Sequence, residues 1–249
     1  NLMPSLSMAL GAGETTLLKL TTAYAELVNG GKKITPTMID RIQDRRGMTI
    51  YRHDKRPCEE CNVEVWDDQD EPELPDTREQ PATTAYQVTS MLEGVVDRGT
   101  GRSISVIGKP IGGKTGTTNE SQDTWFMGFS PDLAVGVYVG FDTPQSLGKK
   151  ETGSSVAAPI FRDFMAEALK DQPATPFRVP EGIRLVRING ETGELAQQGD
   201  RNVILEAFKT SSSRLTSSGV LDGSDSGFSP VSTGTVPEKA VRSGTGGLY

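Results

Sequence analysis

The spacing of apolar positions along the chain predicts three amphipathic helices. Leucine, tyrosine and valine recur three or four residues apart within 14–29, and two glycines follow, as is common where a helix ends. The same spacing predicts helices over 82–97 and 157–169. We expect the first helix to belong to the core. In the third helix, the apolar residues expected to share the buried face are Phe161, Phe164, Met165 and Leu169.

Short apolar runs bounded by turn residues predict strands between these helices. Residues 33–43 and 48–51 are expected to pair as a hairpin closed by the turn 44–47. Two further strands are predicted within 125–129 and 133–141, joined by a Ser-Pro-Asp turn. These strands are expected to form an antiparallel sheet that the helices cover, so the predicted fold class is α/β of the α+β type.

The pattern changes twice along the chain. Residues 1–172 are predicted to form one domain, interrupted by a charged surface insertion at about 52–80. Residues 173–208 are predicted to be a proline-marked linker and a small β extension with a hairpin around Asn189-Gly190. Serine, threonine and glycine dominate 209–249, which we expect to be a flexible, disordered tail.

Charge and composition narrow the kinds of partner and segment expected in this chain. The 249 residues carry 26 basic and 33 acidic side chains, which gives a net charge of −7 and argues against nucleic acid as a partner. No apolar run approaches the roughly 20 residues that span a bilayer. The 28 glycines and a hydrophobic fraction of 35% indicate that part of the chain is loop or tail.

The segment G-G-K-T-G-T-T-N, residues 112–119, is the strongest candidate for chemistry. Lys-Thr-Gly among small residues is one of the three motifs of a serine acyl-transfer site. Lys114 is suited to place a positive charge beside a nucleophile, and Thr115 and Thr117 to offer hydroxyl donors to a substrate carboxylate. Gly116 would let an extended substrate lie against the strand, and the Thr117 N–H would serve as an oxyanion donor.

A phosphate-binding loop is the rival interpretation. Gly108, four residues and Gly113-Lys114-Thr115 fit G-x-x-x-x-G-K-S/T. That loop needs a helix directly after it, to receive the phosphate at its N-terminus. Two strands are predicted here instead, and Pro110 removes a backbone donor that a phosphate cradle needs. The acyl-transfer interpretation is therefore favoured.

Beyond this motif, the chain resembles the C-terminal half of the transpeptidase domain of class A, bifunctional penicillin-binding proteins. The resemblance covers most of residues 1–170 in the family's order. The segments that carry it are P-S-L-S-M-A-L-G-A-G-E-T-T-L-L-K-L-T-T-A-Y-A-E-L-V-N-G-G (4–31), L-E-G-V-V-D-R-G-T-G (92–101), G-K-T-G-T-T-N (113–119), W-F-M-G-F-S-P-D-L-A-V-G-V-Y-V-G-F-D (125–142) and A-A-P-I-F (157–161).

The two other motifs of the family are missing from this chain. In the family, S-x-x-K, whose serine is acylated, and S-x-N both precede the segment with which this chain begins. One S-x-x-K is present, at residues 146–149, but it follows a Thr-Pro turn and lies after K-T-G, so Ser146 is expected in a surface loop. S-x-N is absent. We therefore expect an incomplete, C-terminal fragment that is inactive by itself.

The resemblance implies a penicillin-binding transpeptidase or serine β-lactamase-like fold and a D,D-transpeptidase activity in the intact parent. The implied catalytic residues are Lys114, Thr115, Gly116 and Thr117, and the implied substrate-binding residues are Thr115, Thr117, Thr118 and Trp125. Trp125 also suits the core of a sheet. The partners implied are stem peptides ending in D-Ala-D-Ala, β-lactams as inhibitors and the missing N-terminal part, on the periplasmic side of the bacterial inner membrane and anchored through that part. No cofactor or metal is implied.

Two alternatives from other classes stay open. A D,D-carboxypeptidase or β-lactamase would use the same K-T-G strand with water as the acceptor. A chain without the nucleophile is also compatible with a non-catalytic binding fragment. The long segments shared with class A proteins favour transfer.

The charged insertion holds a second candidate site. Cys58 and Cys61 form C-E-E-C, with His53, the single histidine, nearby. Two thiols and one imidazole leave a zinc ion without a fourth ligand. In the periplasm that the resemblance implies, a disulfide between Cys58 and Cys61 is the better interpretation. The acidic residues around them lack the spacing of a calcium loop.

Overall fold

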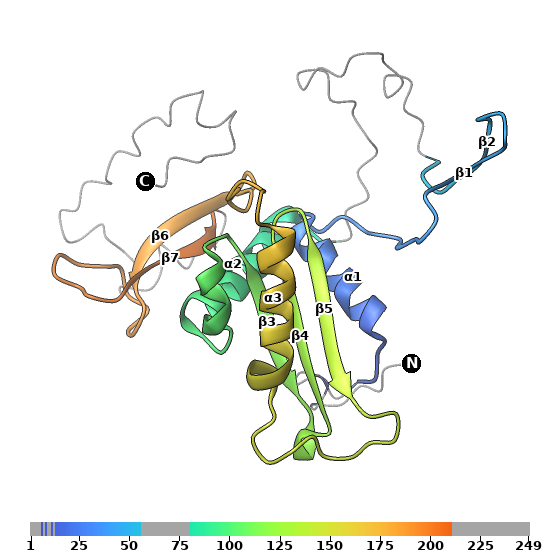
Figure 1. Ribbon diagram of the computed structural model, residues 1–249. Coiled ribbons are helices and arrows are strands. Elements are labelled where there is room, and N and C mark those ends of the chain that lie inside the picture. Colours follow the sequence, from blue (N-terminus) through green and yellow to red (C-terminus); the bar gives the residue numbers. More distant parts are fainter. Residues whose placement is uncertain (1–5, 7, 9–10, 12, 56–79, 211–249) are drawn as a thin grey trace.

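The computed structural model describes residues 6, 8, 11, 13–55 and 80–210 (Figure 1). Two short 3₁₀ helices, Arg102–Ile107 and Asn119–Ser121, and a π-helical turn, Gly153–Ala157, join the main elements. The main elements in chain order are α1 (Leu17–Val28), β1 (Arg41–Gln43), β2 (Thr49–Arg52), α2 (Ala82–Arg98), β3 (Gly112–Thr117), β4 (Asp123–Phe129), β5 (Ala134–Gly140), α3 (Ala158–Ala168), β6 (Ile183–Asn189) and β7 (Val203–Lys209).

A three-stranded antiparallel sheet forms the centre, in the order β3-β4-β5. The Ser-Pro-Asp turn is tight: the Ser130 N–H donates to the Leu133 carbonyl at 2.8 Å, which closes the β4–β5 hairpin. Helices lie on both faces of the sheet, as Figure 1 shows for α1 and α3. The predicted fold class, an antiparallel sheet covered by helices, is confirmed.

The main core lies between the sheet and α3. The rings of Phe126 on β4 and Phe161 on α3 stand 4.7 Å apart, and both side chains are fully buried. Gly128 makes this contact possible, because a Cβ at that position would lie 2.5 Å from the Phe161 ring. The other buried members of this cluster are Val96, Ile104, Ile111, Ala157, Ala158, Met165 and Leu169.

The opposite face of the sheet is covered by α1. Tyr24 packs its ring 6.4 Å from that of Phe129, and the Thr21 hydroxyl reaches the Met127 sulphur at 3.8 Å. The expectation that this helix belongs to the core is wrong in one respect. None of its residues is fully buried, and Leu18 is 61% exposed. The reason is that α1 packs through one narrow stripe and no described element covers its outer side.

One residue predicted on the buried face of the third helix lies to the side of that face. Phe161, Met165 and Leu169 are buried, but Phe164 is 53% exposed. Residues advance by about 100° around a helix, so Phe161, Met165 and Leu169 form one stripe and Phe164 lies well to its side. The prediction of Phe164 on the buried face is therefore wrong.

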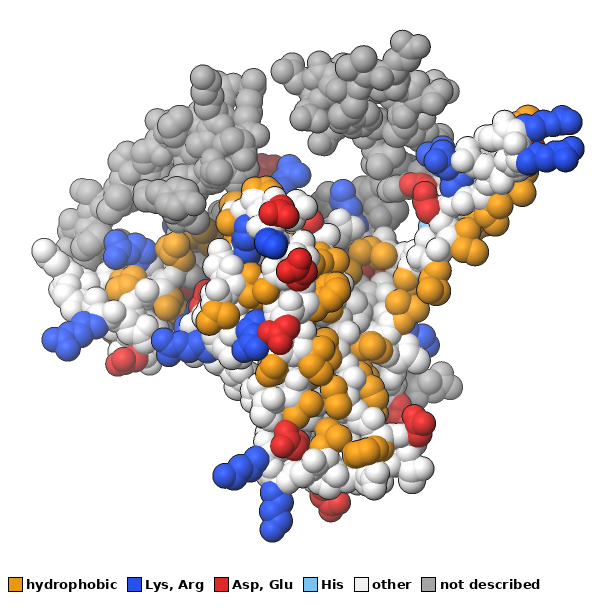
Figure 2. Space-filling model, in the orientation of Figure 1, with side chains coloured by type: hydrophobic (Ala, Val, Ile, Leu, Met, Phe, Trp, Pro, Cys, Tyr) orange, Lys and Arg blue, Asp and Glu red, His pale blue; other side chains and the backbone are white. Residues whose placement is uncertain are grey.

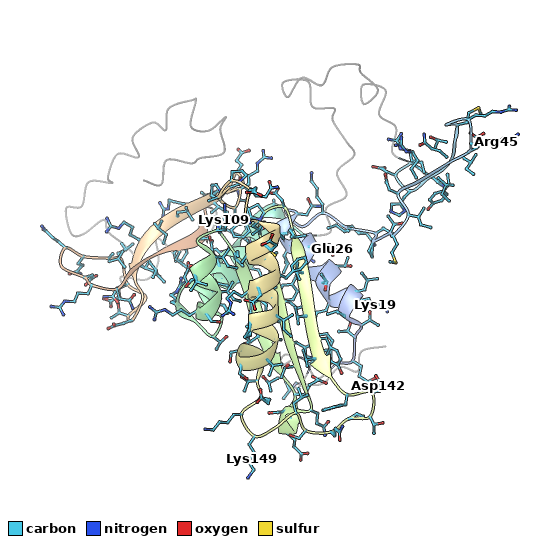
Figure 3. The ribbon with its side chains drawn as sticks, viewed as in Figure 1. Lys19, Glu26, Arg45, Lys109, Asp142 and Lys149 are labelled. Carbon is cyan, nitrogen blue, oxygen red and sulfur yellow. The ribbon has the colours of Figure 1, made fainter. Side chains whose placement is uncertain are left out.

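The β1–β2 hairpin projects away from the sheet (Figure 1). The predicted turn is present, with the Gly47 N–H bonded to the Asp44 carbonyl at 3.0 Å, and Arg45 lies at its tip (Figure 3). The first strand is shorter than the predicted 33–43, whereas the second has the predicted length and is shifted by one residue from 48–51. Hydrophobic side chains line the projecting arm (Figure 2), where Ile50 is 68% exposed, so few tertiary contacts extend the pairing.

The C-terminal extension is a two-stranded ribbon that docks on α2. The Gln87 side-chain amide donates to the Ala207 carbonyl at 2.8 Å, and the Lys209 ammonium to the Thr84 hydroxyl at 2.7 Å. The predicted turn after Asn189 exists, but the main partner of β6 is β7, which was not predicted. Since Lys209 pairs with Ile183, the strand also extends to the residue where the tail was predicted to begin.

The remaining predictions for the tail and for the charged insertion, with Cys58 and Cys61, lie outside the described residues. Among the helices that the structure describes, none is long and apolar enough to cross a membrane.

Candidate functional site

The K-T-G motif occupies β3, which has a single strand partner, β4, among the described residues. Side chains alternate between the faces of a strand, and the pairing shows which face each one takes. Lys114 pairs with Met127, which contacts α1, whereas Thr115 pairs with Phe126, which packs under α3. The lysine therefore lies on the α1 face, and the hydroxyls of Thr115 and Thr117 lie on the α3 face.

Part of the β3 backbone points toward the free edge of this strand, which is the edge that no described strand pairs with. Bonded and non-bonded pairs alternate along antiparallel strands. The Thr118 N–H donates to the Asp123 carbonyl at 3.2 Å, so this pair is bonded and the next pair, Thr117 with Thr124, is not. The N–H and C=O of Thr117, and likewise those of Thr115, therefore point away from β4.

The Lys114 side chain is exposed and bends to the free edge. Its ammonium donates to the Thr115 carbonyl at 2.8 Å. That carbonyl is one of the groups of β3 that point away from β4. A positive charge and two backbone N–H groups that no described strand pairs with thus share one edge of the sheet.

Each hydroxyl of the motif has one neighbour on the α3 face. The Thr115 hydroxyl lies 2.9 Å from the Thr100 hydroxyl, in the turn that follows α2. The Thr117 hydroxyl accepts a hydrogen bond of 3.0 Å from the Gly153 N–H, at the start of the π-helical turn before α3. Sequence reasoning missed both partners. Thr100 and Gly153 carry no sequence pattern that points to the K-T-G strand.

Two other predicted substrate-binding residues are engaged within the fold. The Thr118 hydroxyl accepts from the Asp123 N–H at 3.0 Å and lies 3.3 Å from the Asp123 carbonyl, which closes the end of the hairpin. Trp125 is half-buried on the α1 face. Its indole N–H donates to the Asp123 carboxylate at 2.8 Å, and its ring meets that of Tyr138 edge-on at 4.6 Å. Asp123 thus orients the Trp125 side chain.

The glycines of β3 make room for the surrounding core. A Cβ at Gly112 would lie 2.8 Å from the Phe129 ring and 3.3 Å from the Glu93 nitrogen on α2. A Cβ at Gly113 would lie 2.7 Å from the Phe126 ring. At Gly116 the nearest atom is the Trp125 Cβ, at 3.2 Å. The bare Gly116 Cα therefore accommodates Trp125 on the α1 face.

Glu93, on α2 behind the start of β3, has a shifted pKa that no pattern in the sequence indicates. Burial and the nearby negative charge of Asp97 raise its pKa to about 7, although Arg98 acts in the opposite direction. Burial, together with the charge of Glu93, also raises the pKa of Tyr86 to about 12. Only the three-dimensional packing of α2 shows that this carboxyl is partly buried.

The rival sites do not assemble. A strand, not a helix, contains Lys114 and Thr115, which contradicts the phosphate-loop interpretation. Ser146 is exposed in the loop after β5 and donates to the Glu120 carbonyl at 2.8 Å, and Figure 3 shows Lys149 pointing away from the sheet. The described residues contain no cluster of three metal-ligating side chains.

Known proteins of one family are similar to this chain. Residues 4–166 match the model of the penicillin binding protein transpeptidase domain family. Penicillin-binding protein 1A of Rickettsia bellii (strain RML369-C) is 50% identical over 207 residues, which are 82% of this chain and 26% of that protein. Penicillin-binding protein 1A of Neisseria gonorrhoeae is 40% identical over 188 residues, 75% of this chain and 22% of that protein.

A solved structure is similar over the same region. The 2.6 Å crystal structure of Penicillin-Binding Protein 1A from Haemophilus influenzae superposes with a TM-score of 0.68 and 32% identity, over 84% of this chain and 34% of that one. The chain thus spans about a quarter of the length of the curated relatives it matches.

Proposed function

Because the chain belongs to the penicillin-binding protein transpeptidase family, we propose that it supplies the K-T-G strand of a serine D,D-transpeptidase. In the full-length protein that carries this chain, that enzyme cross-links peptidoglycan stem peptides ending in D-Ala-D-Ala. β-Lactams inhibit it by acylating the same serine. It acts on the periplasmic side of the bacterial inner membrane, to which it is anchored outside this chain.

The observation that carries this proposal is the arrangement along β3. Lys114, two hydroxyls and the outward N–H groups of Thr115 and Thr117 all belong to one strand with a free edge. An acyl-transfer site needs donors aimed at the oxygen on which negative charge develops. It also needs donors for the carboxylate that ends the substrate. This strand offers both kinds of donor.

The reaction has two steps. A serine supplied by the rest of the full-length protein attacks the carbonyl of the penultimate D-Ala. An ester to the serine forms, the peptide bond breaks, and the terminal D-Ala leaves with the serine's proton. An amine of a second stem peptide then attacks the ester, which forms the cross-link and returns a proton to the serine oxygen.

The residues of this chain assist both steps. Lys114 supplies positive charge and proton-relay support beside the serine. The Thr117 N–H, directed to the free edge, is one oxyanion donor. The hydroxyls of Thr115 and Thr117 hold the terminal carboxylate, Gly116 between them adds no side chain at the edge where the substrate lies, and Thr118 and Trp125 border the substrate.

The test uses the full-length protein and this chain side by side. A fluorescent penicillin should label the full-length protein on a serine outside this chain and leave the isolated chain unlabelled. Incubation with two stem peptides should release D-Ala and form a cross-linked dimer. Release of D-Ala without the dimer would show a carboxypeptidase, and stable labelling of Ser146 would contradict the proposed site.

A further inference from the structure

The two hydroxyls of the K-T-G strand are each held by a neighbour from a different part of the fold. Gly153 N–H reaches the Thr117 hydroxyl at 3.0 Å, and the Thr100 hydroxyl reaches that of Thr115 at 2.9 Å. A hydroxyl has one proton to donate and two lone pairs to accept with. Where its partner donates, its own proton stays available for a substrate.

The Thr117 bond has a defined direction. A backbone N–H only donates, so the Thr117 oxygen is the acceptor. Among the described residues, the Thr117 hydroxyl has no second hydrogen-bond partner. Its proton is therefore free on the α3 face of the free edge, where the carboxylate of a substrate is proposed to bind.

The Thr115 hydroxyl is likewise the acceptor of its hydrogen bond with Thr100 when substrate is present. A carboxylate accepts hydrogen bonds and donates none when ionised. Thr115 must then give its proton to the substrate, and the 2.9 Å contact is kept only if Thr100 donates. We propose that Thr100 is a positioning residue, which turns the hydroxyl proton of Thr115 toward the substrate carboxylate. This inference rests on the proposed function.

The turn that carries Thr100 is fixed by the helix before it. The N–H groups of Gly99 and Gly101, on either side of Thr100, both donate to the Val95 carbonyl, at 3.1 and 3.0 Å. Gly101 is buried, and a Cβ there would lie 3.5 Å from the Val96 side chain. The backbone of Thr100 is thus held from both sides, which places its hydroxyl without help from substrate.

The test compares a substrate analogue with and without the carboxylate. Thr100→Val and Thr100→Ser are made in the full-length protein, and second-order acylation rates are measured by mass spectrometry with benzylpenicillin and with its methyl ester. We expect Thr100→Val to acylate about three- to tenfold more slowly with benzylpenicillin, the effect of one lost hydrogen bond. Thr100→Ser should restore most of the rate, and the ester should acylate all three proteins equally.

The matched control is Thr22→Val, which removes a hydroxyl on α1 that bonds to the Leu18 carbonyl at 2.8 Å, away from the site. An unchanged benzylpenicillin rate in Thr100→Val overturns the inference, and so does an equal loss with the ester or a Thr100→Ser variant as slow as Thr100→Val. Failure of benzylpenicillin to acylate the unsubstituted protein overturns the proposed function, and the inference with it.

Discussion

Gly153 lies directly against Gly116, on the face of the sheet opposite Trp125. A Cβ at Gly153 would lie 2.6 Å from the Gly116 carbonyl oxygen and 3.0 Å from the Gly116 nitrogen. These neighbours are backbone atoms of the sheet, which cannot rotate away as a side chain does. The absence of a side chain at Gly153 is thus what lets the start of α3 approach the K-T-G strand.

Gly153→Ala should therefore destabilise the protein and displace the strand. Overpacking against fixed atoms should cost about 2 kcal/mol or more of unfolding free energy. Denaturant unfolding of the full-length protein measures the cost. Gly101→Ala is the control, because its Cβ would lie 3.3 Å from the nearest atom and should cost less. Equal stability of Gly153→Ala and the parent would contradict the close approach.

Lys114→Ala should slow acylation without weakening the fold. The ammonium is exposed and contacts the Thr115 carbonyl, so its loss removes charge from the site and little packing. We expect a fall of about 100-fold in the second-order rate with penicillin and an unchanged thermal midpoint. Lys149→Ala, in the exposed loop after β5, should behave like the parent. If Lys114→Ala were acylated at the rate of the parent, the proposed role of this strand in catalysis would be wrong.

Two phenylalanines of α3 should differ sharply in their effect on stability. Phe161 is fully buried against Phe126, and its replacement by alanine should cost about 3–5 kcal/mol. Phe164, on the same helix, is 53% exposed, and Phe164→Ala should cost less than about 1 kcal/mol. Urea unfolding of both variants measures the difference. Similar losses would mean that α3 packs through another face.

The Glu93 carboxyl should make stability depend on pH. The folded protein keeps its proton to about pH 7, whereas the ordinary pKa is 4.5. The folded state therefore binds more protons between these values, and the contribution of Glu93 to stability declines as pH rises from about 4.5 to about 7.

Glu93→Gln should remove that decline. At pH 8 the variant should be more stable than the parent by about 2–3 kcal/mol, and at pH 4 the two should be nearly equal. Denaturant unfolding across this range provides the measurement. Glu167→Gln, on an exposed position of α3, is the control, and its difference in stability from the parent should not grow with pH. A constant difference at every pH would rule out the buried ionisation.

Local patterns were sufficient for the centre of the fold. The strands β4 and β5 are neighbours in sequence and the Ser-Pro-Asp turn closes their hairpin, so apolar runs and turn chemistry predict them. The strand β3 has no apolar alternation and was expected only from its K-T-G motif. The partner of β6 was not predictable in this way. That partner, β7, is separated from β6 by a loop. The pairing of β6 with β7 depends on the contact of β7 with α2.

The residues around the motif show a similar limit. Lys114, Thr115 and Thr117 were identified because their spacing has a chemical meaning. Thr100 and Gly153 were missed because their contacts join segments far apart in the chain, and neither residue type is unusual in a turn. The exposure of Phe164 could not be predicted either, because it depends on which side of α3 packs against the sheet.

The free edge of β3 also has a consequence for self-association. An edge strand with outward N–H and C=O groups is a template on which a second polypeptide can add a strand, and natural sheets often block such edges with a lysine. Lys114 bends over this edge and occupies the Thr115 carbonyl. The same side chain that is proposed to serve catalysis thus also occupies a carbonyl group with which an added strand would pair.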